Sequence, residues 1–195
     1  MESFFIDFGL SWVISKVLPY VFMLIIGVSI QLLMRRVIKR RSINRLLFVW
    51  LITFVPFIIY FALFPIYQGD FSNSYQLKKD LLTHEDIDQY DLVVVTIPNC
   101  PYCEESIGVV KKMKKRVPNL KIKYLVCSSK AASLVRFKKM IDDNFEVELA
   151  NNKDLLAKYV AFNFPSFIRV RDDKMAFWTN DNFGVPARDF IEKSR

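Results

Sequence analysis

The sequence predicts an α/β domain that follows two membrane-spanning α-helices, and three observations support this fold class. The first is a pair of long apolar runs without a charge, residues 17–34 and 46–68. The second is the alternation of apolar strand patterns with amphipathic helix patterns over residues 88–195. The third is a Cys-X-X-Cys motif that stands directly between a strand pattern and a helix pattern.

The two apolar runs are long enough to cross a bilayer. They contain eighteen and twenty-three residues, which as helices reach roughly 27 and 34 Å against a hydrocarbon core of about 30 Å. The first run extends back to about residue 10 if the Lys16 side chain snorkels to the interface. A pair of buried core helices is the alternative, but a soluble domain of this size rarely contains two such apolar runs without amphipathic partner helices next to them. We therefore expect residues 1–68 to form a membrane anchor with transmembrane helices at about 10–34 and 46–68.

The segment between the two runs predicts the orientation of the anchor. Residues 35–45 carry six basic residues and no acidic one, so this loop is expected to stay in the cytoplasm. The N-terminus and everything after residue 68 are then extracytoplasmic, as in a multi-pass protein of the cell (inner) membrane that faces the periplasm or an equivalent compartment. The basic residues lie between apolar runs rather than on a folded face, so no nucleic-acid partner is expected.

Beyond the anchor, composition changes abruptly to polar and charged residues over 69–87, which we interpret as a linker with a short helix near residues 74–82. The domain proper is predicted at residues 88–195. Its expected strands are 92–97, 120–127, 167–170 and 175–179, the last two forming an antiparallel hairpin around a turn at 172–174. Its expected helices are 104–116, 131–142, 153–159 and 186–193.

The motif at residues 100–103 is Cys-Pro-Tyr-Cys, and a Phe-Pro-Ser sequence at 164–166 precedes the predicted hairpin. In these two features the chain resembles the thioredoxin superfamily over about residues 88–195. The resemblance implies a thioredoxin-like fold and thiol–disulfide oxidoreductase activity. It also implies that Pro165 matches the cis-proline that packs beside the active cysteines in that superfamily.

Cys100 and Cys103 are the predicted catalytic residues. Free N–H groups and the positive end of the macrodipole at a helix start favour the thiolate of Cys100, which would attack a substrate disulfide. Cys103, one helical turn later, would resolve the mixed disulfide. Glu104 and Glu105 follow immediately; at a helix start their charges interact favourably with the macrodipole but also disfavour a nearby thiolate.

Three further residues, Tyr102, Phe164 and Pro165, are predicted to bind substrate, and Trp178 is a further aromatic candidate for the same groove. Thioredoxins usually carry a buried acid about six residues before the first cysteine, where this chain has Val94. No glycine pair follows the hairpin as a glutaredoxin-type glutathione site requires, so no glutathione binding is expected.

The remaining residues predict no cofactor and no resident metal, because no second Cys pair or His cluster accompanies the motif. Two alternatives stay open for the pair itself, a structural disulfide and a metal-binding pair of the copper-chaperone type. Cys127 ends a predicted buried strand and is expected to be an inert core thiol.

Together these features predict a membrane-anchored thiol–disulfide oxidoreductase whose partners are protein thiols or disulfides, the lipid bilayer and a membrane electron donor. The motif is compatible with both reduction and formation of disulfides. The alternative function is a non-catalytic accessory subunit of a larger membrane complex, which would use the thioredoxin-like domain as a docking module.

Overall fold

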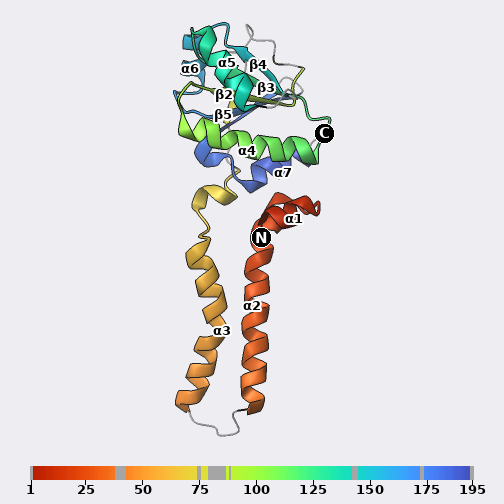
Figure 1. Cartoon of the computed structure of the whole chain (residues 1–195), viewed down its shortest axis with the longest axis vertical. Coiled ribbons are helices and arrows are strands. Elements are labelled where there is room, and N and C mark those ends of the chain that lie inside the picture. Colours follow the sequence, from red (N-terminus) through yellow and green to blue (C-terminus); the bar gives the residue numbers. More distant parts are fainter. Residues whose placement is uncertain are drawn as a thin grey trace. The chain divides into compact units, whose positions relative to one another are not determined.

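The computed structural model describes residues 2–37, 43–73, 76–78, 87, 89–141, 145–171 and 174–193. The chain divides into two compact units, Met1–Gln68 and Gly69–Arg195. The elements described in the first unit are all helices, and the second unit is a mixed α/β domain (Figure 1).

The first unit contains the short helix α1 (Glu2–Asp7) and the long helices α2 (Trp12–Val37) and α3 (Ile43–Leu63). Within α2, the segment Trp12–Met34 is long and apolar enough to cross a membrane, and in α3 a shorter segment, Trp50–Leu63, is apolar. The two helices pack closely, because a Cβ atom at Gly27 would overlap the backbone carbonyl of Thr53. Tyr20 and Tyr60 add an edge-to-face ring contact, with ring centroids 4.9 Å apart.

The second unit is built on a six-stranded mixed sheet with the strand order β1-β6-β5-β2-β3-β4. The parallel half consists of β2, β3 and β4, whereas β5 pairs antiparallel with both β2 and β6, and β6 pairs antiparallel with β1. The strands are β1 (Gln76–Lys78), β2 (Leu92–Thr96), β3 (Ile122–Val126), β4 (Glu146–Leu149), β5 (Ser166–Arg171) and β6 (Lys174–Thr179).

Helices cover both faces of this sheet. In Figure 1, α4 (Pro101–Arg116) and α7 (Val185–Lys193) lie below the sheet, and α5 (Ala131–Met140) packs beside α4, since Arg136 of α5 forms an ion pair with Glu104 of α4. The helix α6 (Lys153–Tyr159) covers the other face. Every residue of β2 is buried, as the continuous apolar run 92–97 predicts for a central parallel strand. Val93 and Val95 pack in one core cluster with Leu156 of α6, and Val94 points to the opposite face because strand side chains alternate. The short 3₁₀ segments η1 (Gln68–Phe71) and η2 (Asn180–Asn182) complete the described elements.

The structure differs from the sequence-based expectation in two strands. Residues 76–78, expected within a helix, form β1, in which Gln76 pairs with Phe177 of β6; the other residues expected in that helix, 74–75 and 79–82, lie outside the described part of the chain. The unexpected strand β4 extends the sheet beyond β3. Both strands are short, three and four residues, so neither is long enough to display a clear alternation in sequence.

The predicted hairpin is confirmed, since β5 and β6 pair antiparallel along their length. Residues 172 and 173, which belong to the predicted turn, lie outside the described residues. The helix expected at 153–159 has the same bounds in the structure, and α4, α5 and α7 each begin or end within a few residues of the predicted positions.

Candidate active site

The two motif cysteines lie where β2 gives way to α4. Cys100 is the N-cap residue of α4, with an extended backbone conformation, and Pro101 occupies the first helical position, where its missing N–H costs no hydrogen bond. The Cys100 sulfur accepts a hydrogen bond from the backbone N–H of Cys103 at 3.2 Å. The sulfur therefore takes the place of the side-chain oxygen that usually caps a helix start.

Burial separates the two thiols, both of which are free. Cys100 remains 8% exposed, whereas Cys103 is completely buried. Burial raises the pKa of the Cys103 thiol, and the hydrogen bond with Cys100 and the negative charge of Glu104 act in the same direction. At neutral pH Cys103 is therefore a neutral thiol, and Cys100 is the more exposed of the two sulfurs.

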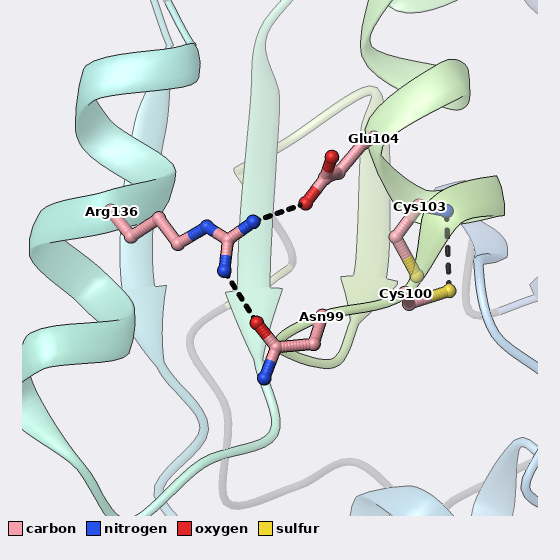
Figure 2. Close-up of polar contacts among 5 residues, drawn as sticks. All are labelled: Asn99, Cys100, Cys103, Glu104 and Arg136. Carbon is pink, nitrogen blue, oxygen red and sulfur yellow. Dashed lines mark hydrogen bonds and ion pairs between the residues drawn. The ribbon is translucent and has the colours of Figure 1, made fainter.

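One arginine from a different helix holds both flanks of the motif. The guanidinium of Arg136, on α5, donates a hydrogen bond to the side-chain oxygen of Asn99 and forms an ion pair with Glu104 at 2.9 Å (Figure 2). Asn99 has a φ of 59°, a left-handed conformation that asparagine tolerates better than most residues. Arg136 thus contacts the residue before Cys100 and the residue after Cys103.

The segment around Pro165 approaches the same cysteine from the other half of the sheet. The Phe164–Pro165 peptide bond is cis, as the resemblance to thioredoxins implies. The backbone carbonyl of Phe164 lies 3.9 Å from the Cys100 sulfur and accepts a weak hydrogen bond from its thiol. Ser166 then begins β5, which pairs with β2, and this pairing brings residues 64 positions apart in the chain together.

The aromatic candidates occupy different environments. Tyr102 is 61% exposed next to the cysteines, and Phe164 is half-buried against the core cluster. Trp178 is completely buried and contacts Phe183 and Phe190, so it belongs to the core rather than to a groove. Phe162 was not expected from the sequence as a site residue, yet it is exposed two residues before Phe164.

The residue at position 94 is a valine rather than the buried acid usual in thioredoxins, and the residue paired with it on the neighbouring strand is a tyrosine. Tyr124 of β3 pairs with Val94, and its hydroxyl is buried without a hydrogen-bond partner among the described residues. Burial, with a smaller contribution from Cys103, raises the pKa of this tyrosine. Cys127, just after β3, is partly buried against the core cluster. Within the described ranges, no group of three His, Cys, Asp or Glu residues could hold a metal ion.

The strand order, the cysteine pair at a helix start and the cis-proline before the hairpin together define a thioredoxin-like fold. No protein-family model matches the chain, and no curated protein matches its sequence.

Among solved structures, the chain is similar to a secreted Mycobacterium tuberculosis disulfide oxidoreductase homologous to E. coli DsbE. The two share 15% identity with a TM-score of 0.43, and the match covers 53% of this chain and 80% of that one. It is also similar to a thioredoxin-like protein from Bacteroides caccae, at 10% identity and a TM-score of 0.39, over 74% of this chain and 62% of that one. The topology and the site geometry carry the fold assignment.

Proposed function

We propose that this protein is a membrane-anchored thiol–disulfide oxidoreductase that acts on extracytoplasmic protein cysteines through Cys100 and Cys103. The observation that carries the proposal is the arrangement of the two sulfurs. Cys100 lies at the free N–H groups of a helix start, with Cys103 buried one turn behind it. A helix start favours the thiolate, which is the reactive form in disulfide exchange.

In the reducing direction, the Cys100 thiolate attacks one sulfur of a substrate disulfide. The second substrate sulfur leaves as a thiolate and takes up a proton, and a mixed disulfide joins the substrate to Cys100. Cys103 then loses its proton and attacks the Cys100 sulfur, which forms the Cys100–Cys103 disulfide and releases the first substrate sulfur as a thiol that carries a proton. Two electrons pass from the protein to the substrate.

The same steps in reverse form a disulfide in the substrate. In either direction the cysteine pair must be restored, by a membrane electron donor with a dithiol or by an acceptor with a disulfide. A domain tethered close to the bilayer meets such membrane partners at high effective concentration.

Membrane anchoring through two spans is part of this proposal. The support is the length and hydropathy of Trp12–Met34, in whose apolar 18-residue window only 22% of the residues are buried, together with the apolar character of Trp50–Leu63. The basic segment 35–45 favours a cytoplasmic loop and an extracytoplasmic domain. Reporter fusions after residues 40 and 195 test this topology: we expect a cytoplasmic signal at the first site and an extracytoplasmic signal at the second, and equal location of both would contradict it.

The catalytic proposal is tested by a trap. Replacing Cys103 with Ala removes the resolving thiol, so mixed disulfides between Cys100 and substrate proteins should accumulate and disappear on treatment with dithiothreitol. The matched controls are Cys100→Ala with Cys103→Ala, which removes the attacking sulfur, and Cys127→Ala with Cys103→Ala, which removes only the third thiol.

Adducts that depend on Cys100 and not on Cys127 support the oxidoreductase, and their identification gives the substrates and the redox partner. The absence of any adduct, with a wild-type pair that stays oxidised whatever reductant is supplied, would support the accessory-subunit alternative.

A further inference from the structure

We propose that Arg136 is a positioning residue that sets the redox equilibrium of the Cys100–Cys103 pair by neutralising Glu104 and holding Asn99. This inference rests on the proposed function, because it assigns a control element to the same cysteine pair. It concerns a side chain that no pattern around the motif indicates, since Arg136 lies 32 residues after Glu104.

A single guanidinium group contacts two residues at once. Arg136 projects from α5 toward the motif, one of its nitrogens contacts Asn99, and the other contacts Glu104 (Figure 2). A guanidinium suits this task because it is planar, permanently charged and presents several N–H donors at once. The two contacted residues immediately precede and follow the Cys-Pro-Tyr-Cys sequence.

The electrostatic consequence concerns the reduced state. Glu104 lies in the first turn of α4, one residue after Cys103, and its carboxylate disfavours negative charge on the Cys103 sulfur. The disulfide carries no charge, so a nearby carboxylate disfavours only the thiolate that forms in the reduced state. By neutralising Glu104, Arg136 stabilises the reduced form, and a pair whose reduced form is stabilised is a stronger oxidant.

The hydrogen bond from Arg136 to Asn99 also stabilises the backbone turn before Cys100. Asn99 adopts the left-handed conformation that turns the chain from β2 into α4. A hydrogen bond from a neighbouring helix to its side chain holds this turn, and thereby the position of the Cys100 sulfur relative to the Cys103 N–H group.

An ordinary surface ion pair is the competing explanation. The side chains of Arg136 and Glu104 are 52% and 39% exposed, and such pairs contribute little to folding stability. Folding stability does not distinguish a positioning role of Arg136 from an ordinary surface ion pair, because both allow the stability of the Arg136→Ala variant to equal that of wild type. The redox equilibrium distinguishes them, since an ion pair without influence on the cysteines leaves it unchanged.

The experiment is a glutathione titration of the purified full-length chain in detergent at pH 7.5. In this equilibrium two molecules of reduced glutathione convert the protein disulfide into a dithiol and become one oxidised glutathione. A maleimide mass tag counts the free thiols, and Cys127 adds the same single tag throughout. The variants are Arg136→Ala, Glu104→Gln, the two combined, and the control Lys139→Ala, which removes a positive charge from an exposed position of the same helix.

With Arg136→Ala we expect the equilibrium to shift toward the disulfide by about three- to tenfold, tenfold corresponding to about 30 mV. Glu104→Gln should shift the equilibrium toward the dithiol. The equilibrium constants of the combined variant and of Lys139→Ala should both lie within about twofold of the wild-type value.

An Arg136→Ala value equal to that of Lys139→Ala would overturn the inference, and so would a shift that Glu104→Gln fails to reverse. A wild-type pair that no glutathione ratio reduces also overturns it. The outcome is separable from the proposed function, because the titration needs no protein substrate: a shift without trapped adducts in cells keeps the role of Arg136 and removes the proposed substrates.

Discussion

The backbone N–H of Cys103 donates a hydrogen bond to the sulfur of Cys100 at 3.2 Å, while the thiol of Cys103 is completely buried behind it. The two residues are therefore unequal partners, although they belong to the same four-residue motif. The Cys100 sulfur lies at the free N–H groups of the helix start, whereas the Cys103 thiol is shielded from solvent. This difference leads to a prediction about the second step of the exchange reaction.

The resolution step should depend strongly on pH. Burial raises the pKa of Cys103, so the neutral thiol dominates below that pKa and the thiolate fraction rises about tenfold for each pH unit. After reaction with an aromatic disulfide reagent such as 5,5′-dithiobis(2-nitrobenzoate), the release of the second thionitrobenzoate should accelerate close to tenfold per unit between pH 6 and 8.5, as followed by stopped-flow absorbance. With Cys127 replaced by Ala throughout, so that no third thiol reacts, Cys103→Ala should show only the first release. A second phase independent of pH would contradict the assignment of Cys103 as a protonated resolving thiol.

Gly27→Val should disrupt the packing of α2 against α3. A Cβ atom at this position would overlap the carbonyl of Thr53, and helix interfaces in membranes use small residues for such close approach. We expect a loss of about 1–3 kcal/mol, typical of overpacking, seen as a lower thermal midpoint of the helical signal in detergent. The control is Val28→Ala, at the exposed neighbouring position, where a change within about 0.5 kcal/mol is expected. Equal effects of the two substitutions would contradict the close approach.

Two glycine-to-alanine substitutions in the α/β domain should have opposite effects. Gly108 is exposed within α4 and an added Cβ meets no atom within 4 Å, so Gly108→Ala should stabilise the domain by about 0.5–1 kcal/mol through lower backbone entropy of the unfolded chain. At Gly184 the added Cβ would lie 2.6 Å from the carbonyl oxygen of Asp70 and 2.7 Å from that of Ser72. Gly184→Ala should therefore destabilise the domain. Urea unfolding measures both, and a shared sign would be inconsistent with these environments.

The ion pair on β3 and β4 should make stability depend on acid. The buried ammonium of Lys123 lies 2.7 Å from Glu148 and 3.8 Å from Glu146, and its hydrogen bond lowers the pKa of Glu148. A carboxyl with a lowered folded-state pKa stabilises the fold above its unfolded pKa of about 4.3. This contribution disappears as the pH falls through the folded value.

Glu148→Gln should accordingly cost about 0.5–1 kcal/mol at pH 7, a small value because Glu148 is half-exposed. The difference from wild type should shrink as the pH falls below about 4.3 and vanish once the pH is below the lowered folded-state pKa of Glu148, as measured by urea unfolding at a series of pH values. A difference that persists unchanged in acid would contradict the pairing with Lys123.

Several elements of this domain are predictable because their signals are local. The apolar run of β2, the amphipathic pattern of α4 and the Pro101 start of that helix are all properties of adjacent residues, and the structure contains each of them. The strands β1 and β4 were not predictable, because Gln76–Lys78 becomes a strand only by pairing with β6 across the sheet. Trp178 illustrates the same limit, because the sequence alone does not distinguish an aromatic residue that lines a groove from one that is buried in the core, as Trp178 is.

The sequence by itself determined the cysteine pair, its place between a strand and a helix, and the proline that precedes the hairpin, because these depend on residue type and spacing. Only the tertiary structure decided what surrounds the pair. It places the Phe164 carbonyl against the Cys100 sulfur, Tyr124 beside Val94 and Arg136 across Asn99 and Glu104. Each of these contacts joins residues about 30 or more positions apart, so it arises from strand pairing and helix packing rather than from any local pattern.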